Sequence, residues 1–167
     1  MELLIVRHGP AGDRDEWRAS GRPDEERPLT KDGRRKTRAA ARGLVELLDG
    51  VDLVATSPWA RAVQTAELIA EAFGGVEELK RPELIPDRAP AELLAWLKTR
   101  RERRIVLVGH EPHLSRFASW LLTGREKSVL NLKKSQAFLL TLKSLAPGEA
   151  TLLWSAPPRA LRGLSQP

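Results

Sequence analysis

Four short apolar runs predict buried strands, at residues 3–6, 51–55, 105–108 and 137–142. Hydrophobicity within each run is continuous rather than alternating, which is typical of strands covered by other elements on both faces. We therefore expect these strands to lie in the interior of a layered fold.

Helical spacing of apolar residues fills the intervals between these runs. It predicts helices over 30–48, over 59–73, from Pro90 through 97, and over 114–122. Thr30 can cap the first helix, Gly74 and Gly75 end the second, and Gly124 ends the last. Strands and helices thus alternate, which indicates an α/β fold with a mostly parallel sheet between helix layers.

The remaining segments carry weaker signals. Residues 10–30 lack periodicity and are rich in charge, Gly and Pro, so we expect a long loop of functional importance. The tail after Pro157 and Pro158 is expected to be poorly ordered. Neither a linker nor an internal repeat is visible, and residues 1–167 read as a single domain.

The composition and the first residues exclude several kinds of chemistry and bear on where the protein is located. Cysteine is absent, which excludes disulfides, a thiolate nucleophile and cysteine-bound zinc or iron–sulfur clusters. The first residues have no basic segment and only four consecutive apolar positions, too few for a signal peptide or a membrane span. We expect a cytoplasmic protein that is not bound to a membrane.

A formal charge of +6 points to an anionic partner without naming it. Basic runs at 34–36, 100–104 and 133–134 could contact nucleic acid. However, the chain has no tyrosine and only three phenylalanines, which supplies few rings for base stacking. We read these runs as solvated faces and do not expect a nucleic-acid partner.

Polar motifs directly follow three of the predicted strands: Arg7-His8-Gly9, Ser57-Pro58-Trp59-Ala60-Arg61 and Gly109-His110-Glu111-Pro112. Ligands of open α/β sheets bind outside the carboxyl ends of the strands, so we expect these motifs to meet in one crevice. Two imidazoles and two guanidiniums in one place require an anion. Phosphate can accept two hydrogen bonds from one guanidinium group. It also suits the N-termini of the helices that follow Ser57 and His110.

Each motif also has a structural explanation when taken alone. Arg7-His8-Gly9 can be a strand-end turn, Arg61 a solvated cation on a helix, and His110 a helix cap or a buried histidine. It is their coincidence at three strand ends that favours function.

These motifs, with Arg27-Pro28-Leu29-Thr30, Gly33 and Gln64-Thr65, resemble the histidine phosphatase superfamily of phosphoglycerate-mutase-like fold, and within it the SixA-type phosphohistidine phosphatases. The resemblance covers about residues 1–113 and implies a three-layer α/β/α sandwich. It also implies that His8 is a nucleophile that becomes phosphorylated, while Arg7, Gly9, Arg61 and His110 bind the phosphoryl group.

The implied reaction fits general principles of phosphoryl transfer, which needs an in-line nucleophile and positive charge around the phosphoryl oxygens. His8 must attack as neutral imidazole, and Arg7 and Arg61 are expected to depress its pKa. Because these cations supply the positive charge, we expect neither a metal nor another cofactor. A metal held by His113 with His110 and His8 is disfavoured, since carboxylate ligands are not evident.

The chain departs from the superfamily pattern at the proton donor. Many members have a glutamate in a Leu-x-Glu stretch, whereas Pro86 follows Leu84-Ile85 here. Asp87 or Glu83 could substitute, although Asp87 can equally cap a helix and Glu83 can be a surface charge. A phosphohistidine needs less help to leave than an alkoxide does, so the gap favours an activated phosphate as substrate.

We therefore expect a metal-independent phosphatase that removes phosphate from protein histidine. A small-molecule phosphomonoesterase using the same site is the first alternative, and a non-catalytic module that binds phosphate or nucleic acid is the second. In the long loop, Arg14, Arg18, Arg22 and Arg27 could recognise an acidic or phosphorylated partner, or could simply be solvated.

Overall fold

The computed structural model describes residues 1–165, and within them a six-stranded sheet has the order β3-β2-β4-β1-β5-β6. Its strands are β1 (Glu2–Arg7), β2 (Leu53–Thr56), β3 (Glu78–Lys80), β4 (Arg104–Gly109), β5 (Ala137–Leu142) and β6 (Ala150–Ala156). Strands β3, β2, β4 and β1 are parallel, and β5 is antiparallel to both β1 and β6. The expected mostly parallel α/β sheet is confirmed.

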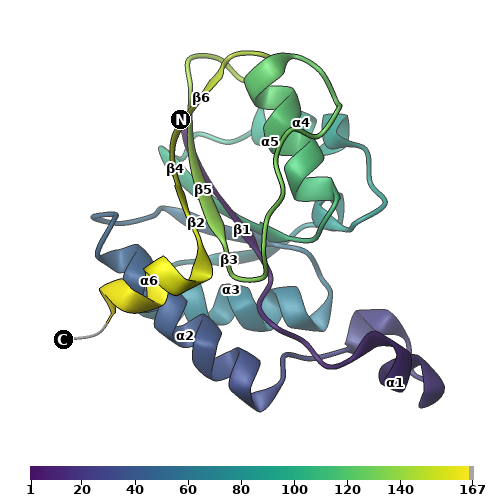
Figure 1. Ribbon diagram of the computed structural model, residues 1–167. Coiled ribbons are helices and arrows are strands. Elements are labelled where there is room, and N and C mark those ends of the chain that lie inside the picture. The colour runs from purple at the N-terminus through teal and green to yellow at the C-terminus, as the bar shows by residue number, and fades with distance from the viewer. Residues whose placement is uncertain (166–167) are drawn as a thin grey trace.

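Helices cover both faces of this sheet (Figure 1). On one face lie α2 (Lys31–Val45), α3 (Ala60–Ala72) and α6 (Pro158–Leu164), and on the other lie α4 (Pro90–Leu97) and α5 (His113–Thr123). Successive strand residues point to opposite faces, so Leu3 and Ile5 join one buried cluster while Leu4 and Val6 join the other. This is why the central strands are apolar throughout.

The capping and helix-ending residues read from the sequence lie at the helix ends of the structure. The Thr30 hydroxyl accepts a hydrogen bond from Gly33 N at 2.9 Å, Pro90 opens α4, and Gly124 ends α5 in the left-handed conformation at φ 73°. These features confirm the predicted starts and stops.

Two segments differ from expectation. Residues 10–30, expected to be a loop, contain a short helix, α1 (Arg14–Ala19), which is capped by Asp13. They also contain a 3₁₀ turn, η1 (Asp24–Glu26). A second 3₁₀ turn, η2 (Pro82–Leu84), precedes α4. Most of the tail expected to be poorly ordered instead forms α6, which packs on α2, while residues 166–167 lie outside the described part of the chain. Leu161 is fully buried there, because Gly43 lets the helices approach so closely that a Cβ on it would lie 1.9 Å from Leu161 O.

Two edge strands, β3 and β6, were not predicted, since both are short of buried apolar residues. Within residues 1–165, no helix is both long and apolar enough to cross a membrane.

Candidate active site

The site forms where three neighbouring parallel strands end. Arg7, the last residue of β1, pairs with Gly109 of β4, and Thr56 of β2 pairs with Val108. The residues that follow these ends therefore emerge side by side at one edge of the sheet. A cavity of about 710 Å³ opens there, and its lining includes Arg7, His8, Arg61 and His110.

Hydrogen bonds from two backbone N–H groups hold the segment after β1, which places His8 in the lining of this cavity. His8 N donates to Gly109 O at 3.0 Å, and Gly9 N donates to Thr65 Oγ1 at 3.0 Å. A Cβ on Gly9 would lie 2.0 Å from Thr37 Oγ1, so a larger residue does not fit without displacement. His8 is only 6% exposed in this setting.

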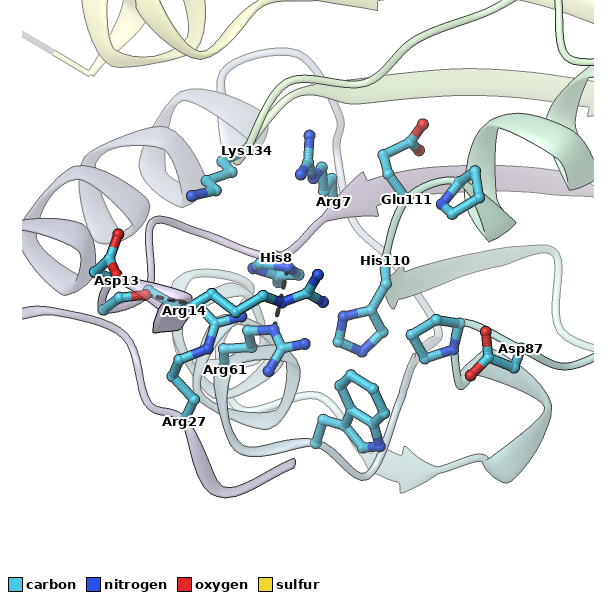
Figure 2. Close-up of a pocket in the computed structure, with 15 residues that line it drawn as sticks. Arg7, His8, Asp13, Arg14, Arg27, Arg61, Asp87, His110, Glu111 and Lys134 are labelled. Atoms are coloured by element: carbon cyan, nitrogen blue, oxygen red, sulfur yellow. Dashed lines mark hydrogen bonds between the residues drawn. The ribbon is translucent and has the colours of Figure 1, made fainter. Parts of the chain in front are cut away.

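Hydrogen bonding selects one tautomer of His8. Its Nδ1 lies 2.8 Å from Gly9 O, and because a carbonyl only accepts, Nδ1 must carry the proton. Nε2 is then unprotonated, and its lone pair accepts a hydrogen bond from Arg61 Nε at 3.3 Å (Figure 2). His8 thus offers an unprotonated nitrogen to the cavity.

Burial is the main reason that His8 stays neutral. Desolvation lowers the pKa of His8 to about 3, with further lowering by Arg61, Arg7 and Lys134, while the hydrogen bond to Gly9 O opposes the shift. The sequence had suggested that Arg7 and Arg61 would be the cause, but their charges contribute less than burial does.

His110 lies beside His8, with 5.0 Å between the ring centroids, and its other neighbour is Trp59 at 4.8 Å. Its Nε2 is 2.9 Å from Ser57 Oγ, while the buried Nδ1 has no hydrogen-bond partner among residues 1–165. Burial, followed by the charges of His8 and Arg61, lowers the pKa of His110 to about 2. The arrangement can supply a neutral hydrogen-bonding group to a ligand.

Arg7 also lines the cavity, between Lys134 and Glu111 in the view of Figure 2. Arg7 Nη1 donates to Leu132 O at 2.7 Å, and Nε is buried without a partner in the described part of the chain. Desolvation lowers the pKa of Arg7, and nearby Glu111 opposes that change. At neutral pH the guanidinium remains charged.

Arg61 is hydrogen-bonded to Asp24, a residue that was not predicted to belong to the site. Arg61 Nη1 donates to Asp24 O at 2.7 Å and Nη2 to Asp24 Oδ2 at 3.0 Å, so the far end of the guanidinium faces Asp24 while Nε faces His8. Asp24 Oδ1 also accepts from Arg27 Nε at 2.7 Å. One carboxylate therefore orients two arginines of the cavity.

Asp24 is ionised in this setting. Partial burial raises its pKa, but the hydrogen bond from Arg27 and the charges of Arg61, Arg27 and Arg14 together lower it below the usual value. Arg14, Arg27 and Lys134 complete a strongly cationic wall around His8 (Figure 2).

The two candidate proton donors occupy different places. Asp87 lines the cavity, whereas Glu83 accepts two hydrogen bonds from Arg81 and is not part of the lining. Asp87 does not cap α4, whose N-cap is Ala89. Glu111 also lines the cavity, and burial raises its pKa although Oε1 accepts from Ser115 N at 3.2 Å. Glu111 was not among the predicted site residues, although its position directly after His110 was an available signal.

His113 takes no part in the cavity lining. It is fully buried with both ring nitrogens unpartnered among residues 1–165. In the same range, no three histidine or carboxylate side chains are grouped so that they could hold a metal ion.

Comparison with known proteins identifies the family. Residues 3–86, half of the chain, match the sequence profile of the histidine phosphatase superfamily, branch 1. The chain belongs to this superfamily. A protein of Picosynechococcus sp. with no characterised function is 37% identical over 138 residues, which are 81% of this chain and 81% of that protein.

Solved structures of other histidine phosphatases share the fold. The protein histidine phosphatase SixA in complex with tungstate superimposes with a TM-score of 0.81 and 26% identity, covering 96% of this chain and 99% of that one. A phosphoserine phosphatase mutant from Entamoeba histolytica gives 0.67 and 17%, covering 96% and 98%, which shows the common fold alone. The chain is thus a SixA-like phosphatase of the superfamily.

Proposed function

We propose that this phosphatase hydrolyses phosphohistidine on a protein through a phosphorylated His8. The observation that carries the proposal is the neutral, oriented imidazole of His8, whose unprotonated Nε2 accepts from Arg61 within a cavity lined with cations. Arg7, Gly9, Arg61 and His110 are the proposed phosphoryl-binding residues. The SixA protein binds tungstate, an anion that resembles phosphate in charge and shape, which supports a phosphate site in a protein of this fold.

In the first step, the hydrogen bond from Arg61 Nε to His8 Nε2 is given up. The lone pair on Nε2 then attacks phosphorus while the nitrogen–phosphorus bond of the substrate breaks. A substrate imidazole that enters protonated departs neutral, and His8 becomes a phosphorylated imidazolium that keeps its Nδ1 proton. Gly9 O, which accepts that proton's hydrogen bond, stabilises the new positive charge. Arginine side chains balance the negative charge on the phosphoryl oxygens.

In the second step, water attacks the phosphoryl group on His8. The bond from Nε2 to phosphorus breaks and its electron pair returns to Nε2. One proton of the attacking water passes to a phosphoryl oxygen, so the product leaves as dihydrogen phosphate. His8 is then again the neutral tautomer seen in the structure. No metal is required by this scheme, because Arg7, Arg61 and Arg27 already surround the site with positive charge.

Pro86 supports a phosphohistidine substrate over a phosphomonoester. It stands where the superfamily resemblance leads one to expect the proton-donating glutamate. Without that acid, departure of an alkoxide is slow, whereas a protonated imidazole leaves readily.

The test compares phosphate release from a phosphohistidine-bearing protein and from a simple phosphomonoester, with a chelator present. We expect rapid release from phosphohistidine alone, and none from the His8→Ala variant. Turnover that survives His8→Ala would refute the phosphorylated intermediate, and turnover that stops with the chelator would refute metal independence. Salt-dependent phosphate binding without turnover would instead indicate a non-catalytic binding module.

A small-molecule phosphomonoesterase is the second candidate, because Asp87 brings a carboxylate into the cavity. If Asp87 donates a proton, Asp87→Asn should slow phosphomonoester hydrolysis and leave phosphohistidine hydrolysis unchanged. Glu83→Gln is the matched control, since Glu83 is occupied by Arg81 and lies outside the cavity lining.

A further inference from the structure

A second cleft, of about 300 Å³, adjoins the catalytic cavity. Arg14 and Trp59 line both spaces, so the two clefts are immediate neighbours. The remaining lining residues of the second cleft are Trp17, Arg18, Arg22 and Asp24. Most of them come from the segment before α2 that carries α1 and η1.

The indole rings of Trp17 and Trp59 line this cleft, and each is fixed by contacts with neighbouring groups. Trp17 Nε1 donates to Pro23 O at 2.9 Å, and the Arg22 guanidinium lies 4.2 Å from the centroid of the Trp17 ring. Trp59 is covered on one side by the Arg61 guanidinium at 4.6 Å. Fixed indole rings give a bound chain apolar surface at little cost in ordering.

The charge of the cleft is unbalanced. Asp24 supplies the carboxylate of its lining, and that group already binds Arg27 and Arg61. Arg22 has an exposed pair with Glu26 at 3.3 Å, whereas Arg18 forms no ion pair with a carboxylate of residues 1–165. The positive charge of the Arg18 guanidinium is therefore not neutralised by any carboxylate of residues 1–165.

We propose that the second cleft binds an acidic side chain of the substrate polypeptide, close in sequence to the phosphorylated histidine. An extended chain advances about 3.4 Å per residue, so a residue two or three positions away reaches a neighbouring cleft. A carboxylate fits the guanidinium groups of Arg18 and Arg22, and the adjacent peptide packs on the indole rings. The proposal rests on the phosphohistidine phosphatase activity proposed above.

The experiment uses two phosphohistidine peptides that differ only in glutamate or glutamine at the second and third positions on each side of the phosphohistidine. The full-length enzyme should have a kcat/KM about fivefold higher for the acidic peptide at low salt, carried by KM, and the preference should fade at high salt. Arg18→Gln/Arg22→Gln should abolish the preference and leave hydrolysis of free phosphohistidine unchanged.

Arg101→Gln/Arg103→Gln is the matched control, because it removes the same charge from two exposed arginines before β4, at the opposite end of that strand from the site. It should keep the preference. Equal cleavage of both peptides by the wild-type enzyme, or a preference that survives Arg18→Gln/Arg22→Gln, would overturn this inference and leave the proposed activity intact. Failure to cleave either peptide or free phosphohistidine would overturn the proposed activity itself.

Discussion

Replacing Asp24 by asparagine should destabilise the free enzyme and make it more dependent on phosphate. The substitution keeps the shape of the side chain but removes the negative charge between Arg61 and Arg27. Three further cations, Arg7, Arg14 and Lys134, line the same cavity. Without Asp24, these charges repel one another until an anion enters.

The size of the effect follows from the burial of the partners. Removing one partner of a fully buried ion pair costs about 3–5 kcal/mol, and exposed pairs are worth about 0.2–1 kcal/mol. The Arg61 side chain is 3% exposed and that of Asp24 is 29% exposed, which places this pair between the two limits. We expect a loss of about 2 kcal/mol, or a fall in Tm of about 4–8 °C for a domain of this size.

Thermal unfolding with and without inorganic phosphate measures both effects. Phosphate should raise the Tm of Asp24→Asn more than that of the wild type, because a bound anion stabilises the folded state in proportion to its affinity. Asp32→Asn is the control: Asp32 also contacts two cations, Arg35 and Lys36, but on the exposed surface of α2, and should change Tm little. Equal phosphate responses in Asp24→Asn and the wild type would refute the reasoning.

Three other predictions concern turnover, packing and pH. Arg61→Ala should lower the rate of phosphate release by about 10²–10³-fold, because a preorganised donor to the phosphoryl group is lost; a smaller loss than tenfold would contradict its role. Gly43→Ala should cost about 1–3 kcal/mol in urea unfolding, since its Cβ would collide with Leu161 O, whereas Gly50→Ala, with open space around it, should not. The three buried histidines have folded pKa values of about 3, 2 and 4, against 6.5 ordinarily, so the unfolded chain binds more protons and stability should fall as the pH drops below about 6.5. His113→Leu should reduce that slope by about one proton, which urea midpoints measured across this range would show.

Much of the fold could be predicted because its causes are local. The central strands are continuous apolar runs, and caps such as Thr30 and Gly124 act within a few residues of their own position. The edge strand β6 escaped prediction because pairing with β5, rather than its own apolar content, holds it in the sheet. Helix α6 was missed for a similar reason: Leu161 becomes buried only when α2 lies against it.

The sequence by itself determined that polar motifs follow three strands of a parallel sheet. Parallel strands bring their carboxyl ends to one edge of the sheet. The meeting of His8, Arg61 and His110 in one cavity follows from that rule. Only the tertiary structure decided how the site is tuned. Asp24 reaches Arg61 across 37 positions of sequence, a contact that depends on the path of the intervening chain. The depressed pKa of His8 likewise comes chiefly from burial, which is a property of the packed fold and not of any motif.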